Sequence, residues 1–106
     1  MIDYEKLAND LIKARKAAEQ SVIGEDGGSA NRDYLTLKLK GYREDKTLEI
    51  IRKSGLSGFK AEWIGQRYFI CPPKGAMGND RVRQVEAMYK VMSEAGYDAL
   101  MYQQMD

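Results

Sequence analysis

The stretch Phe59–Pro73, FKAEWIGQRYFICPP, most constrains the fold, because it has the pattern of a β-hairpin. Gly65 followed by Gln66 suits a type II′ turn, whose twist matches antiparallel strands. With that turn, the expected cross-strand pairs are Ile64/Arg67, Trp63/Tyr68, Glu62/Phe69, Ala61/Ile70, Lys60/Cys71 and Phe59/Pro72. Alternation then predicts one core-facing set: Phe59, Ala61, Trp63, Tyr68 and Ile70. Pro72 and Pro73 end the second strand, since proline has no N–H for a sheet.

The chain has 106 residues, which predicts one domain over residues 1–106, with an N-terminal helix over 1–22 and a core over 33–106. Seventeen basic and sixteen acidic residues give a net charge of +1, so no strong overall field attracts nucleic acid or membrane. A single cysteine excludes an internal disulfide framework. No apolar run of about eighteen residues spans a bilayer, and the acidic start is unlike a signal peptide. We therefore expect a cytoplasmic protein without a membrane partner.

Periodicity and caps predict the remaining elements. Apolar residues at steps of three and four, from Tyr4 to Ala18, predict a first helix capped by Asp3 and running to about Val22. Around the hairpin, the expected elements are a strand over 34–40, a helix from about Asp45 to Gly55, a helix from Asn79 or Asp80 to Gly96, and a strand over 100–105. The third helix is expected to bury a stripe made of Val82, Val85, Tyr89 and Met92, with Met88 adjoining. Between the first helix and the first strand, IGEDGGSANR is expected to be a loop.

The order after the first helix is β-α-β-β-α-β, which predicts an α+β, ferredoxin-like antiparallel sheet with an additional N-terminal helix. In that topology, the first strand and the second hairpin strand are central, and the other two strands lie at the edges. The expected core residues are Trp63, Tyr68, Ile70, Leu35, Leu37, Val85 and Met92. The N-terminal helix has two expected places: across the open face of the sheet, or at an edge or subunit contact.

The residues that usually carry catalysis are scarce. The chain has no histidine, which removes Ser-His-Asp and Cys-His arrangements and ordinary zinc sites. The carboxylate pairs Glu25–Asp26 and Glu44–Asp45 are interpreted as solvation and capping. Cys71 needs a neighbouring cation to be reactive, and Lys60 is the expected cross-strand neighbour. We therefore expect no enzymatic activity, no cofactor and no metal.

The loop KGAMGNDRVR suggests an anion site. Backbone amides at a helix N-terminus favour anions, and Lys74, Arg81 and Arg83 add positive charge there. The loop matches neither the Walker A motif nor the dinucleotide-binding motif. An ordinary connection between a strand and a helix is the alternative interpretation.

The β-α-β-β-α-β order is similar to that of RNA-recognition domains, which display aromatic residues on the open face of the sheet. On that face we expect aromatic and basic residues to alternate, as a single-strand binder requires: Tyr34, Lys38, Lys40, Arg67 and Phe69. The segments GQRYFICP and TLKLK do not fit the two motifs of that family. Nucleic-acid binding is therefore the alternative hypothesis, and a half-polar surface or one covered by the first helix is the simpler reading.

A non-enzymatic interaction or regulatory protein, acting by occupying a partner surface, is the leading hypothesis. In size and composition the chain resembles small accessory proteins and inhibitors encoded by phages or mobile elements. The final strand is expected at an edge of the sheet with apolar groups on both faces and no proline. Its expected interface residues are Met101, Tyr102 and Met105. The partner is either another protein or a second copy in a homodimer.

Overall fold

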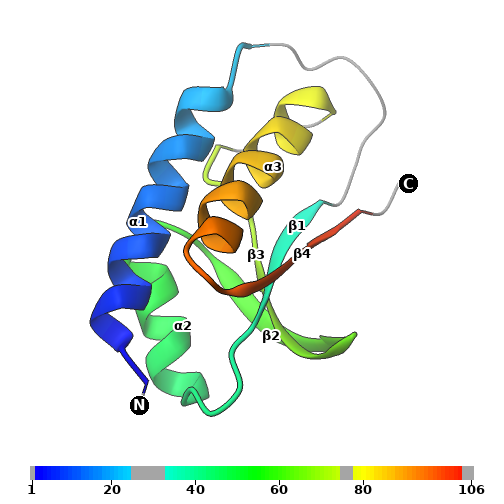
Figure 1. Ribbon diagram of the computed structural model, residues 1–106. Coiled ribbons are helices and arrows are strands. Elements are labelled where there is room, and N and C mark those ends of the chain that lie inside the picture. The colour runs from blue at the N-terminus through cyan, green and yellow to red at the C-terminus, as the bar shows by residue number, and fades with distance from the viewer. Residues whose placement is uncertain (1, 25–32, 75–77, 104–106) are drawn as a thin grey trace.

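A four-stranded antiparallel sheet and three helices form the α+β fold in the part of the chain that the structure describes (Figure 1). The structure is a computed structural model, and it describes residues 2–24, 33–74 and 78–103. In chain order the elements are α1 (Tyr4–Ser21), β1 (Tyr34–Lys38), α2 (Glu44–Lys53), β2 (Gly58–Trp63), β3 (Gly65–Ile70), α3 (Asn79–Glu94) and β4 (Asp98–Tyr102). This is the order that the sequence predicts, with β1 and β4 shorter than expected.

The strands lie in the order β2-β3-β1-β4, and each pair of neighbours is antiparallel. Strands β3 and β1 are therefore central and β2 and β4 are at the edges, as expected from the sequence. Leu35 of β1 is paired with Ile70 of β3 on one side and with Met101 of β4 on the other. Because side chains alternate along each strand, this register sets which residues share a face.

All three helices lie on one side of the sheet (Figure 1). Helix α1 begins after Asp3, whose side chain accepts a 2.9 Å hydrogen bond from the backbone N–H of Lys6. Its small residues Ala14 and Ala18 are fully buried, which lets α1 approach α3 closely. The expectation that this helix crosses the open face is wrong: α1 packs on α3 and α2 on the already covered side.

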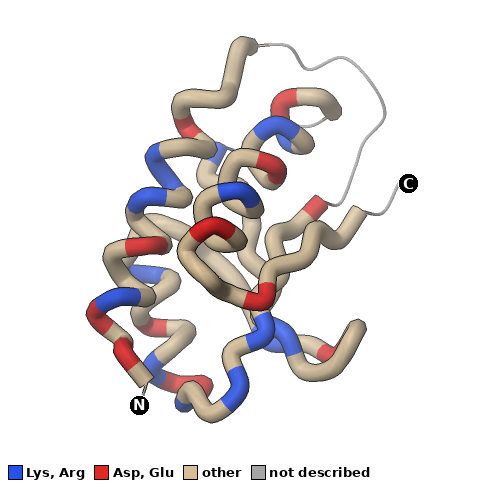
Figure 2. Tube along the Cα trace, in the orientation of Figure 1, with Lys and Arg blue, Asp and Glu red and all other residues tan. Residues whose placement is uncertain are grey.

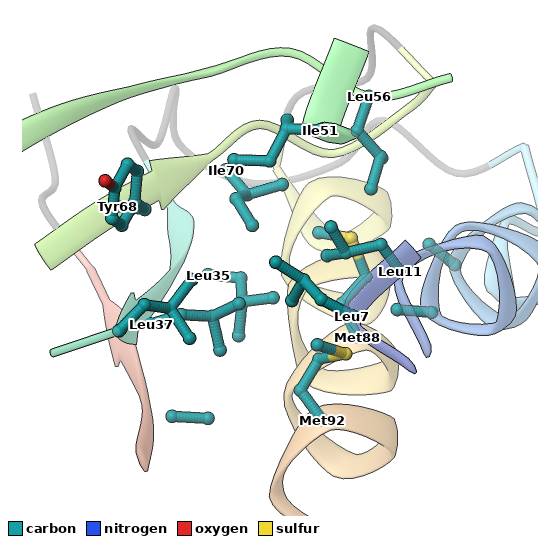
Figure 3. Packing of buried hydrophobic residues seen from close by; sticks show 14 residues of the cluster. Leu7, Leu11, Leu35, Leu37, Ile51, Leu56, Tyr68, Ile70, Met88 and Met92 are labelled. Atoms are coloured by element: carbon teal, nitrogen blue, oxygen red, sulfur yellow. The ribbon is translucent and has the colours of Figure 1, made fainter. Parts of the chain in front are cut away.

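The core lies between the helices and one face of the sheet (Figure 3). Leu7 and Leu11 of α1 meet Met88 of α3 and the inward leucines of β1. The residues of the predicted core that are buried here are Leu35, Leu37, Tyr68, Ile70, Val85 and Met92. Helix α3 buries Val85, Met92 and the adjoining Met88 as expected. It is rotated from the expected stripe in that Gln84 is fully buried while Val82 and Tyr89 are half-buried.

The hairpin register differs from the predicted one by three residues. Trp63 is paired with Gly65, so the chain turns at Ile64, and Gly65 adopts a φ of 75° that favours glycine. An odd shift moves every residue of β2 to the other face relative to β3. Trp63 is consequently 39% exposed and Phe59 44% exposed, so their prediction as core residues is wrong. The new register brings Phe59 opposite Phe69 and places both with Tyr34 on the open face.

The same shift separates Cys71 from its expected neighbour. Lys60 is paired with Tyr68, and Cys71 instead donates its backbone N–H to Ser57. The Lys60 ammonium lies 3.6 Å from a carboxylate oxygen of Glu44. The predicted Lys60–Cys71 pair is therefore wrong.

Some sequence predictions fall outside the described residues: the pair Glu25–Asp26, Met105 and positions 75–77 of the loop before α3. None of the described helices is long and apolar enough to cross a bilayer. Among the described residues, no group of three or more histidine, cysteine, aspartate or glutamate side chains could hold a metal ion.

The two faces of the sheet predict different effects of large-to-small substitutions. Leu37→Ala removes a fully buried side chain and should lower the free energy of unfolding by about 2–5 kcal/mol. Trp63→Ala removes a partly exposed ring and should cost clearly less, despite the larger side chain. Urea denaturation of the two variants checks this order, and a Trp63→Ala variant that is the less stable of the two would contradict the observed register.

Candidate functional site

Five aromatic side chains gather on the sheet face opposite the helices. This open-face cluster consists of Tyr34, Phe59, Trp63, Phe69 and Tyr102. Each of the four strands contributes at least one ring, so the cluster crosses the whole width of the sheet. The helices lie on the other side (Figure 1). The cluster is the largest group of aromatic contacts within the described residues.

Phe69, on a central strand, is the ring that the other four surround. It stacks on Phe59 with ring centroids 5.3 Å apart and planes 13° apart. It meets the edge or tilted face of the other three rings at 5.3–6.3 Å, the distances expected of favourable aromatic pairs. Phe69 is thereby 5% exposed, while Phe59 and Trp63 stay largely open to solvent. The rings and the neighbouring Ala61 and Glu62 line a shallow hollow of about 310 Å³.

Arg67 stands beside the cluster, on the same face of β3 as Phe69, and is 1% exposed. Its Nε donates to the Thr36 hydroxyl at 2.9 Å, and its Nη2 donates to the backbone carbonyl of Asp98 at 2.9 Å. The same Nη2 lies 3.3 Å from the Asp98 carboxylate. The guanidinium thus ties β3, β1 and β4 together across the sheet. Its Nε and Nη2 are engaged and its side chain is 1% exposed, so the structure gives no support to the phosphate contact expected of it.

The other basic residues expected on the open face separate. Lys38 lies at the end of β1 and is exposed, paired across the sheet with Asp98. Lys40 is also exposed but lies beyond the end of β1, so strand alternation no longer assigns it to this face. Arg81 of α3 reaches the cluster instead: its guanidinium carbon is 5.3 Å from the centre of the Tyr34 ring. Of the described basic residues, Lys38 and Arg81 therefore flank the aromatic rings.

The three cations expected to form an anion site before α3 do not converge. Arg83 forms a 3.0 Å ion pair with Asp80, a carboxylate that is 1% exposed in the first turn of α3. Arg81 turns to Tyr34, and the backbone of Lys74 is held by Gln84, which accepts from its N–H and donates to its carbonyl. A buried carboxylate at this helix N-terminus opposes an anion there.

Strand β4 is an edge strand, as the predicted interface requires. Tyr102 belongs to the open-face cluster, with its ring centroid 5.0 Å from that of Trp63. Met101 alternates to the helix side and is half-buried. Met101 and Tyr102, the two described residues of the predicted interface, therefore lie on different faces, and Tyr102 is the one that joins the aromatic surface.

A hydrogen-bonded group of titratable side chains lies away from the open-face cluster. The hydroxyl of Tyr97 donates a 2.9 Å hydrogen bond to Asp10, which also accepts from Lys6 at 2.8 Å. Burial raises the pKa of Tyr97 above its ordinary value, and the hydrogen bond to Asp10 raises it further. The same ammonium of Lys6 donates to the carbonyl of Ala95 at 3.1 Å, so this group joins α1 to the end of α3. The contacts of Tyr97, Asp10 and Lys6 therefore have a structural role.

Sequence reasoning placed Tyr34 and Phe69 on the open face but missed Phe59, Trp63 and Tyr102 as their partners. Alternation did show that Phe59 and Trp63 share one face of β2. The pairing register of the hairpin, which decides which face that is, differed from the prediction by three residues.

Comparisons of the chain with protein-family models, with curated proteins and with solved structures found no match.

The buried network of Arg67 predicts a cost for a substitution that keeps its charge. Arg67→Lys should lower the free energy of unfolding by about 1–3 kcal/mol, because a lysine leaves buried acceptors of the network without donors. Arg52→Lys is the matched control, at an exposed position of α2, and should change stability by less than about 0.5 kcal/mol. Chemical denaturation measures both, and equal values for the two variants would show that the network contributes little.

Proposed function

We propose that this chain is a non-enzymatic binding protein whose open-face cluster covers an apolar surface on a partner protein. The observation that carries the proposal is the set of five packed rings on the sheet face opposite the helices. Burying apolar surface of this kind is favourable, and contiguous exposed apolar patches on folded proteins commonly mark interaction sites.

The distribution of charge supports a protein partner. Interface centres are rich in aromatic residues and poor in charge, with polar groups at the rim. The charge of Arg67, beside the rings on the same face, is buried and paired to Asp98. Lys38 and Arg81 lie at its margin. The partner expected from this arrangement has an apolar centre and acidic groups around it.

We further infer that the fold is ferredoxin-like, with α1 as an addition. The strand order β2-β3-β1-β4 and the antiparallel neighbours support this, together with the β-α-β-β-α-β sequence of elements after α1. Such sheets present one face to helices and leave the other available, so the inferred fold agrees with binding through the open face.

The partner can be sought with a photo-crosslinking phenylalanine analogue at position 59. Once the crosslinked protein has been identified and purified, the fluorescence of Trp63 reports its binding, because the chain has no other tryptophan. Phe59→Ser should weaken binding by about tenfold or more, as expected of an aromatic side chain at an interface centre. The control is Ile23→Ser, which removes an apolar side chain that is 65% exposed after α1 and should leave binding unchanged.

Equal weakening by the two variants would contradict this site for the partner. Sedimentation over a wide concentration range tests the case of a second copy. A dimer that Phe59→Ser dissociates identifies the partner as the chain itself, with the open-face cluster at the contact.

Single-stranded nucleic acid is the second candidate occupant. The observation that favours it is that Arg81 stacks on Tyr34, next to the exposed ring of Phe59. Bases stack on exposed aromatic rings, while neighbouring cations contact the phosphates. Lys38 and Arg81 supply such cations, and Lys40 follows β1 nearby.

If nucleic acid binds here, an oligothymidylate should quench Trp63 fluorescence, and its affinity should fall by tenfold or more between about 50 and 200 mM salt. Lys38→Glu combined with Lys40→Glu should abolish that binding. Lys13→Glu combined with Lys16→Glu makes the same change in net charge on the exposed side of α1 and should have a smaller effect. The absence of quenching at low salt would reject this candidate.

A further inference from the structure

A second hollow lies where the end of β1 meets the β2–β3 hairpin, and it is distinct from the open-face cluster. Its volume is about 290 Å³, and three of its lining residues are lysines: Lys38, Lys40 and Lys60. The other lining residues used here are Tyr68 and Gly65, and no acidic side chain among the described residues lines it. Figure 2 shows basic positions, in blue, near one another in this part of the molecule.

The hydroxyl of Tyr68 is the polar group that the fold leaves unexplained. Tyr68 is 2% exposed, and its hydroxyl oxygen has no hydrogen-bond partner among the described residues. In Figure 3 this oxygen points away from the packed leucines and methionines. A buried hydroxyl without a partner costs free energy, commonly about 1–3 kcal/mol, so a bound acceptor would recover part of that cost.

Lys38, Lys40 and Lys60 line the same hollow as Tyr68 and bring positive charge to it. The Lys60 ammonium lies 5.7 Å from the centre of the Tyr68 ring. The ammonium of Lys38 lies beside Gly65, where a side chain on that residue would come within 3.5 Å of it. Lys38 therefore extends from β1 to the hairpin, along the wall of the hollow.

Three carboxylates near these lysines form ion pairs or hydrogen bonds. Glu44 lies 3.6 Å from Lys60, and it is the one acidic group that directly offsets the charge of the site. Asp98, opposite Lys38 in the sheet, is bonded to Arg67, and Glu62 accepts a 3.0 Å hydrogen bond from Gln66. Three ammonium groups against one paired carboxylate leave the hollow positive.

We propose that this hollow binds a phosphate group, with the Tyr68 hydroxyl donating to a phosphate oxygen and the ammonium groups of Lys38, Lys40 and Lys60 neutralising its charge. The hydroxyl needs an acceptor, and the lysines favour one that carries more than one negative charge. A phosphate monoester or inorganic phosphate meets both requirements. The site contains none of the rings proposed to bind a protein partner, although it shares Lys38 and Lys40 with the nucleic-acid candidate.

The test is a titration of the isotopically labelled chain with sodium phosphate, followed by amide chemical shifts and compared with sodium chloride at equal ionic strength. Phosphate should shift the resonances of Lys38, Lys40, Gly65 and Tyr68, and it should raise the melting temperature in proportion to its binding. Tyr68→Phe should weaken phosphate binding by about tenfold, because a hydrogen bond to a charged group is lost. The same variant should melt at or above the temperature of the unchanged chain, since none of the described residues bonds to this hydroxyl.

Lys60→Gln is the second variant and should weaken phosphate binding several-fold, whereas Lys16→Gln on the exposed side of α1 should leave it unchanged. Phe59→Ser should also leave it unchanged, which separates this site from the open face. A nucleoside monophosphate that binds as tightly as inorganic phosphate assigns recognition to the phosphate group alone, and tighter binding assigns it to a phosphoester of a larger molecule. Shifts equal to those in chloride, unchanged binding by Tyr68→Phe, or a lower melting temperature for that variant would overturn the proposal.

Discussion

The structure depends on the burial of one face of a four-stranded sheet beneath three helices. Leu7 and Leu11 of α1 and Met88 of α3 meet the inward residues of the central strands, and this contact removes most of the core from water (Figure 3). Because α1 fills the space next to α3 on the covered side, none of the described helices remains for the other face. The apolar and charged side chains of that open face must therefore cover or pair with one another.

It does so with two neighbouring arrangements. Phe69 is covered by four other rings, and Arg67 is covered while its guanidinium bonds to groups on β1 and β4. A buried guanidinium is tolerated when its N–H groups have acceptors, and here backbone and hydroxyl oxygens supply them. The rings around Phe69 then form an apolar surface that is supported by these buried contacts. Both proposed sites depend on one feature, the hairpin register, which sets the rings on one side and brings Lys60 to Tyr68 on the other.

Most elements of this fold were predictable because their signals are local. The cap at Asp3 and the apolar stripe of α1 depend on neighbouring residues in the chain, and the structure confirms both. Strand β1 forms as its alternation predicts, but its burial does not alternate, because Thr36 is as fully buried as Leu35 and Leu37. The order of strands was predictable from connection lengths and handedness. The candidate site was predictable in part: Tyr34 and Phe69 were expected on the open face, but the phosphate role expected of Arg67 ignored how deeply a strand residue can be buried by its neighbours.

The sequence by itself determined which residues share a face of each strand, since alternation has a period of two and needs no partner. Tertiary structure alone decided which face of β2 joins the core, because the hairpin turns at Ile64, a one-residue detail that neither the glycine nor the alternation reveals. It also decided where α1 lies. An apolar stripe indicates that one side of a helix must be buried, but packing decides which surface buries it. Here Ala14 and Ala18 fit closely against α3 rather than against the rings of the open face.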